Sequence, residues 1–337
     1  MPPSRGMLHL SHLSEALQSM QITFVAALCL ICGIATGVLA RFAESICTRL
    51  RLMDVPGERK HHSKATPLLG GLALTCVILP LSVVAIFLGS DPALRQSELL
   101  YVVATFALAL VGMADDRRSV SARDRILLGI LVFASIAMVD PLFNVRVLSF
   151  YAPGIEFGLA IGLIAVAFTT LCCVGLVNAI NMADGKNGLV IGLCIAWLLL
   201  LACRGPASLM PVIALLLSGL VVLFYFNMRG HLFLGDGGSY GFATAIGLLT
   251  IASYNSPGLH SGRAIYADQI MVMFAVPVLD SFRLTFVRLR RGQSPMAPDR
   301  DHLHHLLQNK FGWPKGLAIY IVLAVAPSLA FFAATAS

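Results

Sequence analysis

The sequence predicts an all-α membrane protein with about ten transmembrane helices. Of its 337 residues, 58% are hydrophobic and only 12% carry a charge, whereas a soluble domain has about 25% charged residues. The apolar residues form long runs, and a helix needs roughly 20 such residues to cross a bilayer. Because these runs are continuous and do not alternate with polar residues, the pattern disfavours a transmembrane β-barrel.

The apolar runs give the order of the predicted spans. They cover residues 22–42, 68–88, 99–114, 126–139, 155–176, 189–203, 209–226, 239–254, 269–287 and 317–333. The fourth and sixth runs are short for a span, so the count is approximate. We interpret 1–337 as a single membrane domain. Its residues 1–20 form either an interfacial helix, since leucines recur there at helical spacing, or a disordered segment.

Positive charge is concentrated on one side of this predicted topology. All but five of the 24 lysines and arginines lie in the loops 40–67, 113–125, 177–188, 227–238 and 283–316. Because loops rich in Lys and Arg stay cytoplasmic, these loops should face the cytosol and both termini the periplasm. The acids and histidines follow the same division, so catalytic loops are expected at the cytoplasmic face. Beyond this charge, nothing indicates nucleic-acid binding.

The first loop on that face carries a basic cluster ahead of a helix start. Arg59, Lys60 and Lys64 form this cluster, with His61 between them, and they precede Gly70 and Gly71. Basic side chains hold phosphate well, and the free N–H groups at a helix start attract anions. The alternative interpretation is a collar of basic side chains that reach toward the membrane surface beside an ordinary helix start.

The second loop begins with an acidic pair, Asp115 and Asp116, at the end of a long apolar helix. A helix C-terminus carries partial negative charge, which disfavours two adjacent carboxylates there. A bound cation would relieve them, and Mg²⁺ commonly bridges carboxylates to substrate phosphates. Ion pairs with Arg117 and Arg118 are the alternative.

The third loop repeats a polar residue every third position: Asn178, Asn181, Asp184 and Asn187. Polar side chains beside a membrane are costly unless they bind something. A ligand site is one explanation, and a hydrogen-bonded cluster between helices is the other.

Two further carboxylates stand near the same face. Asp236 lies between Gly235 and Gly237 at a helix start, where it suits a metal ion close to phosphate oxygens; an N-cap turn is the alternative. Asp280 lies near the end of the ninth apolar run. Since a carboxylate in the membrane is costly, we expect Asp280 to pair with Arg283 or to line the site.

The last loop is crowded with arginines and histidines: Arg291, Arg300, His302, His304 and His305. Such donors can hold a diphosphate. Histidine also binds zinc, but the carboxylates here stand among arginines, which suits oxyanions better.

In this order, on one membrane face, the loops resemble the polyprenyl-phosphate N-acetylhexosamine-1-phosphate transferase family from Asp54 to His305. The last loop, from Ser294, looks like that of the bacterial UDP-GlcNAc:undecaprenyl-phosphate GlcNAc-1-phosphate transferases, Ser-Pro-x-x-Pro-Asp-Arg-x-His-x-His-His. The related muramyl-pentapeptide transferases have three consecutive histidines, which argues against that branch.

The resemblance implies a Mg²⁺ or Mn²⁺ cofactor, an undecaprenyl phosphate acceptor, a UDP-N-acetylhexosamine donor and UMP as by-product. It also implies a bacterial inner membrane and a first step of cell-surface polysaccharide synthesis, such as that of O-antigen. The implied catalytic acids are Asp115, Asp116, Asp184 and Asp236, with Asp236 and Asp116 on the metal. The implied substrate-binding residues are Arg59, Lys60, His61, Asn178, Asn181, Asn187, Arg291, Arg300, His302, His304 and His305.

One departure concerns the donor. Asn187 stands where the family usually has a second aspartate, near the uridine end of the site in relatives, so another UDP-HexNAc donor is an alternative. A ten-helix transporter is the main non-enzyme alternative. Transporters carry ionisable groups near the midplane and often show repeats, whereas here those groups lie in loops on one face. Oligomerisation as a homodimer is left open.

Overall fold

The computed structural model describes residues 5–56, 64–89, 91–152, 154–159, 162–257, 263–294 and 301–335. The helices are α1 (Arg5–Arg41), α2 (Ala43–Leu50), α3 (Gly70–Ala73), η1 (Leu74–Ile78), α4 (Leu79–Gly89), α5 (Arg95–Arg118), α6 (Ala122–Val139), η2 (Pro141–Phe143), α7 (Gly162–Ala183), α8 (Leu189–Arg204), η3 (Ala207–Leu209), α9 (Met210–Met228), α10 (Gly235–Asn255), α11 (Ala267–Arg290), α12 (Leu303–Phe311) and α13 (Lys315–Ala334). The strands are β1 (Met53–Asp54), β2 (Thr66–Pro67), β3 (Val147–Ser149) and β4 (Glu156–Gly158).

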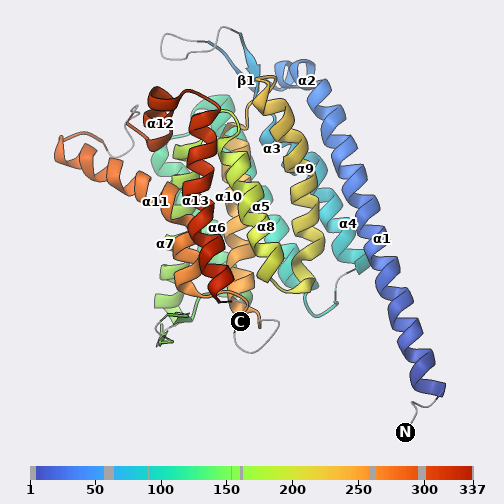
Figure 1. The fold of residues 1–337 in the computed structure, drawn as a ribbon. Coiled ribbons are helices and arrows are strands. Elements are labelled where there is room, and N and C mark those ends of the chain that lie inside the picture. The colour runs from blue at the N-terminus through green and yellow to red at the C-terminus, as the bar shows by residue number, and fades with distance from the viewer. Residues whose placement is uncertain are drawn as a thin grey trace.

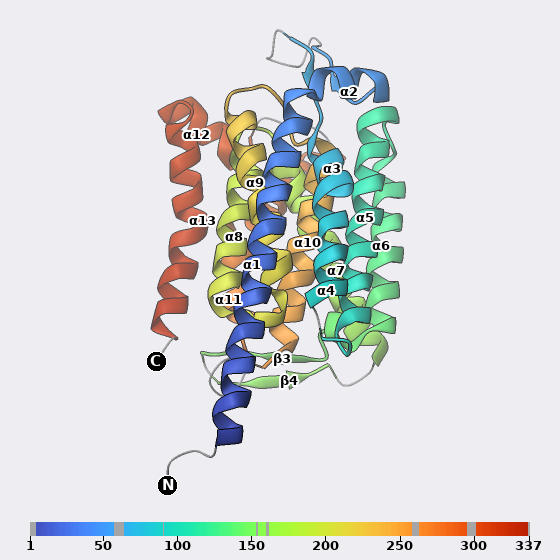
Figure 2. The same cartoon turned by 90° about the vertical axis from the view of Figure 1, so that its right-hand side faces the viewer.

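The long helices run side by side as a bundle with two distinct ends (Figures 1 and 2). We call one end the α12 end; it also carries α2 and the β1–β2 hairpin. The other is the β3–β4 end, where α1 begins and α13 ends. α3, the π-helical turn η1 and α4 follow one another without a break and act as one helix of the bundle.

Helix α10 is the centre of the bundle and packs against α5, α7 and α8. Every residue from Gly237 to Tyr254 is buried. Glycine, alanine, serine and threonine recur along this segment. Because lipid supplies no hydrophobic force between helices, close backbone packing of small residues holds membrane helices together, and α10 has the composition for that role.

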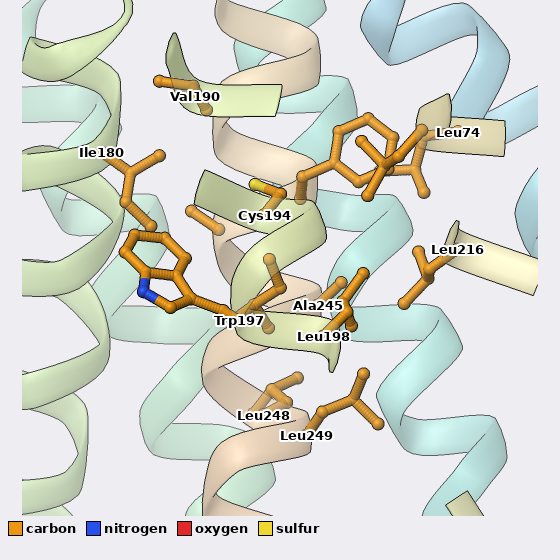
Figure 3. Packing of buried hydrophobic residues seen from close by; sticks show 14 of the residues in the cluster. Leu74, Ile180, Val190, Cys194, Trp197, Leu198, Leu216, Ala245, Leu248 and Leu249 are labelled. Atoms are coloured by element: carbon orange, nitrogen blue, oxygen red, sulfur yellow. The ribbon is translucent and has the colours of Figure 1, made fainter. Parts of the chain in front are cut away.

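The short helix α8 is buried beside α10. Its Trp197 is completely buried and donates its indole N–H to the carbonyl of Met273 at 2.9 Å. Figure 3 shows Trp197 of α8 next to Ile180 of α7. Leu198, also of α8, faces the side chains of α10. α8 is apolar nearly all round, as expected of a helix with protein on most sides.

The outer helices expose large apolar side chains. Leu30, Val103, Leu163, Met271 and Leu329 are each more than half exposed. They belong to α1, α5, α7, α11 and α13. A soluble monomer rarely exposes so much apolar surface, and the surface fits a bundle embedded in lipid.

Each of the ten predicted apolar runs coincides with a helix, but fewer helices qualify as spans on their own. Over the described ranges, seven are long and apolar enough to cross a bilayer: residues 19–41, 70–89, 95–118, 162–183, 207–228, 267–290 and 315–334. The others are α6, which begins with charged residues, α8, which has 16 residues, and α10. The structure is therefore that of a polytopic helical membrane protein, and the count of ten remains a prediction.

The structure refines two details of the sequence prediction. The fifth predicted span, near 155–176, corresponds to α7, which begins at Gly162, while β4 occupies Glu156–Gly158. The fold is also not purely α, because β1–β2 and β3–β4 form small antiparallel sheets. Strands of two or three residues are too short to show an alternating pattern, so periodicity could not reveal them.

Candidate active site

Four aspartates from three helix ends converge at the α12 end of the bundle. Asp115 and Asp116 belong to the last turn of α5, Asp184 directly follows α7, and Asp236 is in the first turn of α10. The carboxyl groups of Asp236 and Asp115 lie against one another, and Asp184 lies near both Asp236 and Asp116. Residues far apart in the chain thus form a single acidic cluster.

Asp116 holds the start of α10 in place. Its two carboxylate oxygens accept the backbone N–H groups of Asp236 at 2.8 Å and Gly237 at 2.9 Å. The first N–H groups of a helix have no partner inside it and carry partial positive charge. The N-cap residue is Leu234, whose side chain cannot accept a hydrogen bond. Asp116 therefore supplies from α5 the cap that α10 lacks.

Glycines allow this close approach. A Cβ atom on Gly112, one turn before Asp116, would lie 2.2 Å from the carbonyl oxygen of Asp236. A Cβ atom on Gly70 would lie 2.4 Å from the carbonyl oxygen of Leu234. The N–H of Gly70 donates to that same carbonyl at 3.0 Å, so it is not open to a phosphate as the sequence had indicated. Gly70 and Gly112 instead let α3 and α5 touch the α10 backbone.

Asp115 is bound from the neighbouring helix. It forms an ion pair with Arg125 of α6, and its Oδ1 accepts the N–H of Val120 at 2.7 Å. The sequence had offered Arg117 and Arg118 as partners, but both are exposed. The short turn between α5 and α6 brings Arg125 back toward the acids, which nearest-neighbour reasoning along the chain missed.

Asn181 joins the cluster, whereas Asn178, one turn earlier in the same helix, bonds locally. The side-chain amide of Asn181 donates to Asp236 Oδ1 at 2.6 Å and to Ser239 Oγ at 3.0 Å. Asn178 donates to the carbonyl of Val174 within its own helix at 2.8 Å, a local bond typical of Asn in a helix. A role for Asn178 in substrate binding stays a prediction.

The acidic cluster is electrostatically crowded. Burial, and then the nearby carboxylates of Asp236 and Asp116, raise the pKa of Asp184 well above its usual value. Two such acids in one pocket cannot both ionise without cost. A positively charged group, either a cation or a basic part of a substrate complex, would relieve this repulsion.

The short helix α12, which we call the histidine helix, carries a buried histidine that lies next to Asp184 of the cluster. His304, in the first turn of α12, is only 1% exposed, and neither ring nitrogen has a hydrogen-bond partner among the described residues. Its Nε2 would lie 2.5 Å from a Cβ on Gly185, beside Asp184. Burial, followed by His305 and His302, lowers the pKa of His304 to about 3, so the imidazole is neutral. A buried donor and acceptor without partners indicate a ligand site.

The remaining predicted residues lie at the rim or outside the described part of the chain. Arg291 is exposed, and its guanidinium is 3.8 Å from the carboxylate of Asp301. The backbone carbonyl of Asn187 accepts the indole N–H of Trp313 at 3.0 Å. The predictions for Arg59, Lys60, His61 and Arg300 fall outside the described residues.

Sequence reasoning left three residues off the site. Ser239 lies one helical turn after Asp236, a spacing that could have identified it. Arg125 is only ten residues beyond Asp115, behind a turn capped by Ser121, whose Oγ accepts the N–H of Asp124 at 3.1 Å. Gly112 had no signal, because its role depends on a helix more than a hundred residues away.

The acidic cluster suits a divalent cation held partly by substrate. No group of three Asp, Glu, His or Cys side chains in the described ranges is arranged to hold a metal, so a closed protein cage is not formed there. Mg²⁺ usually binds one or two carboxylates and completes its shell with water and phosphate oxygens. Asp236, steadied through Oδ1 by Asn181, fits that role better than Asp116, whose two oxygens already accept backbone N–H groups.

An apolar bundle that gathers four aspartates and a buried imidazole, unpartnered among the described residues, at one end has the arrangement of a membrane enzyme. Comparison with known proteins agrees. Residues 99–254, from α5 to α10, match the model of glycosyl transferase family 4, and this range contains all four aspartates. This stretch is similar to that family and, together with the relatives described next, identifies the chain as an enzyme of the phosphoglycosyltransferase class, as its loops had indicated.

Individual relatives extend the match beyond that range. The chain is 27% identical over 294 residues to the probable undecaprenyl-phosphate N-acetylglucosaminyl 1-phosphate transferase of Bacillus subtilis, covering 86% of this chain and 78% of the relative. It is 28% identical to the undecaprenyl-phosphate alpha-N-acetylglucosaminyl 1-phosphate transferases of Yersinia pestis and Salmonella typhi. These matches cover 84% and 86% of this chain and 77% and 78% of the two relatives.

Proposed function

We propose that this protein transfers N-acetylglucosamine 1-phosphate, or a closely related HexNAc 1-phosphate, from a UDP-sugar to undecaprenyl phosphate, with release of UMP. The product would begin a cell-surface polysaccharide such as O-antigen. The observation that carries this proposal is the meeting of Asp184, Asp236 and the unpartnered His304 at one end of a lipid-exposed bundle. The names of the relatives supply the acceptor and the sugar.

The membrane orientation is part of the proposal. Most lysines and arginines lie in the loops at the α12 end, and such loops stay cytoplasmic. α1 begins and α13 ends at the opposite end (Figures 1 and 2). We therefore place the site at the cytoplasmic face of a bacterial inner membrane, with both termini in the periplasm.

The transfer joins two phosphates. An oxygen of the lipid phosphate attacks the phosphorus that carries the sugar, and the bond from that phosphorus to the bridging oxygen breaks. The bridging oxygen leaves with the electron pair as part of UMP. The acceptor is a phosphate monoester with a second pKa of about 6, so it is largely dianionic and needs little help from a base.

The surroundings of Asp115 support direct attack over a covalent aspartyl intermediate. Its carboxylate is already engaged by Arg125 and by the N–H of Val120. A carboxylate held this way is a weak nucleophile, since its lone pairs face donors. Asp115 is better placed to orient the incoming phosphate through Arg125, whose guanidinium also lies 5.9 Å from the ring of Tyr240.

The difficulty in this reaction is bringing two polyanions together. A Mg²⁺ or Mn²⁺ ion, when bound, supplies positive charge to the diphosphate and the leaving UMP. Asn181 fixes the orientation of the Asp236 carboxylate, which would hold such an ion. His304 is buried and offers one neutral N–H donor, and Lys186 lies close enough to affect its charge state. Hydrogen bonds made by a buried group are stronger than those in water.

The direct test is purified protein with undecaprenyl phosphate and a panel of UDP-sugars, with and without Mg²⁺. We expect UMP to appear in step with lipid diphosphate sugar, and only when acceptor, donor and divalent ion are all present. The panel should contain UDP-GlcNAc, UDP-GalNAc, a UDP-6-deoxy-HexNAc and UDP-glucose, so that it identifies the donor. Uptake of a UDP-sugar into vesicles without UMP release would instead identify a transporter.

A further inference from the structure

Asp280 of α11 ties the histidine helix to the bundle through both of its oxygens. Oδ1 accepts from the guanidinium of Arg283 at 2.8 and 3.2 Å. Oδ2 accepts the backbone N–H of Leu303 at 3.1 Å and lies 3.0 Å from His302 Nδ1. Arg283 also donates to the carbonyl of Asp301. A single carboxylate thus engages the residues that lead into α12 and the first of its amides.

The contact with His302 is the one that is well shielded from solvent. The side chains of His302 and Asp280 are each 9% exposed, whereas that of Arg283 is 46% exposed. An exposed i,i+3 ion pair contributes only a few tenths of a kcal/mol. The ion pair with Arg283 therefore adds little to the stability of α11. The main role of the Asp280 carboxylate is to hold His302 and the start of α12.

Because a carboxylate can only accept, His302 must donate its Nδ1 hydrogen to Asp280. That bond fixes both the tautomer and the plane of the ring, as carboxylates do for histidines in many functional sites. The ring of His302 in turn stacks on that of His304, with centroids 5.4 Å apart and planes 13° apart. His304 has no hydrogen bond of its own within the described residues, so its orientation depends on this stack, on Gly185 and on the ring of His305, 4.3 Å away between centroids.

We propose that Asp280 is a positioning residue for the sugar-nucleotide donor, which acts through His302 to hold His304 over the acidic cluster. This inference rests on the proposed function, since the donor is the ligand whose diphosphate His304 would meet. Asp280 itself lies behind the histidines and touches no substrate.

A double-mutant cycle tests whether Asp280 acts through His302. In the full-length protein, D280N and H302Q should each raise KM for the UDP-sugar about tenfold, as expected for a lost hydrogen bond to a charged group. KM for undecaprenyl phosphate should stay within about twofold. The double variant should be no worse than the worse single variant, since coupled residues do not add. Multiplied effects, or equal changes in both KM values, would overturn the proposal.

Asp268 offers a matched control on the same helix. It lies at the β3–β4 end of α11, where its carboxylate accepts the N–H groups of Tyr151 and Ala152 at 3.1 and 3.0 Å. D268N removes a comparable carboxylate far from the histidines, so KM for the UDP-sugar should stay at the wild-type value. If D268N raised that KM as much as D280N, general destabilisation of α11 would explain the result.

Hydrogen exchange tests the contact without any turnover. In D280N the amides of α12 should exchange about tenfold faster than in the wild type, while those of α13 stay unchanged. A wild-type protein that releases UMP from no UDP-sugar would contradict the proposed function, yet this exchange would still report on the Asp280 contact. An active wild type whose D280N variant shows unchanged exchange and unchanged donor KM would overturn the inference about Asp280 alone.

Discussion

Two aspartates, each in the first turn of a bundle helix, show how a structural carboxylate differs from a carboxylate in the candidate active site. At the β3–β4 end, Asp268 of α11 accepts the backbone N–H groups of Tyr151 and Ala152. At the α12 end, Asp236 of α10 is instead held by a side chain, Asn181, and lies against Asp115. The first carboxylate stabilises a loop, and the second is kept among like charges.

The same contrast holds for neutral polar groups. At the β3–β4 end, the hydroxyl of Tyr254 donates to the carbonyl of Val147 at 2.6 Å and accepts the N–H of Ser149 at 2.7 Å. At the α12 end, His304 is buried with both ring nitrogens unpartnered among the described residues. Unpartnered buried atoms also occur away from the site, since Asn144 Oδ1 and Ser253 Oγ have no partner among the described residues. What marks His304 is that both ring nitrogens are unpartnered and that Asp184 lies close by, and this combination indicates a ligand site better than polarity alone.

The largest effect should come from exchanging the two aspartates for their amides. D236N should lower turnover about a thousandfold or more, because it removes a charge aimed at the reacting phosphates. D268N should leave turnover within about twofold, since its hydrogen bonds serve a distant loop. UMP release by the purified variants measures both, with membrane insertion checked by yield and monodispersity. Near-normal turnover in D236N would refute the role given to Asp236.

A smaller but still large effect should follow from adding one methyl group at the acidic cluster. G112A places a Cβ atom 2.2 Å from the carbonyl oxygen of Asp236, so one backbone must move. Such overpacking costs about 1–3 kcal/mol, and a shift of the α10 start should lower turnover about tenfold to a hundredfold.

Gly175 provides the control for that substitution. It is also in a membrane helix, α7, but a Cβ atom there meets nothing within 4 Å. G175A should keep full activity and stability, since alanine favours helix by about 1 kcal/mol over glycine. Equal turnover in G112A and G175A would mean that the contact between α5 and α10 is not needed to place Asp236.

The sequence predicted those site residues that are marked by their local surroundings, and it missed contacts between helices. Asn181 and Asp184 stood out because polar groups beside long apolar runs are costly. Asp115, Asp116 and Asp236 stood out because they lie at helix ends, and His304 because it lies in a loop rich in phosphate-binding side chains. The helices were predictable from the long apolar runs. The role of Asp116 as a cap for α10, and the pairing of Asp115 with Arg125, depend on which helices touch. Spacing along one helix cannot reveal such contacts, so the alternative pairing with Arg117 and Arg118 missed Arg125 as the partner of Asp115.

The crowding of the cluster predicts a moderate gain in stability on removing a charge. The pKa of Asp184 is raised by burial and by its acidic neighbours, so the folded protein binds this proton more tightly than the unfolded chain does. The carboxylate therefore costs stability increasingly as pH rises above about 4, the unfolded value. Without divalent ions at pH 7.5, D184N should melt about 2 °C or more above the wild type.

The pH dependence separates this explanation from a general packing effect. The difference in melting temperature between D184N and the wild type should shrink toward pH 4, where both states of the wild type carry the proton. Saturating Mg²⁺ should also narrow it if the ion neutralises the cluster. Thermal unfolding in detergent followed by tryptophan fluorescence measures both. A difference that stayed constant from pH 4 to 8 would show that Asp184 is not under charge strain.

The smallest effect should come from replacing Asn187 by aspartate, the residue that the family resemblance implies at this position. Asn187 is partly buried, its carbonyl accepts the indole of Trp313, and it lies outside the acidic cluster. N187D keeps the backbone contact and changes only the side chain, whose Nδ2 would lie 3.9 Å from a Cβ on Gly230. We expect kcat within about threefold of the wild type and a change confined to KM for the UDP-sugar. If kcat fell as far as in D236N, position 187 would belong to the reacting centre. The acidic cluster would then not mark the limits of the active site.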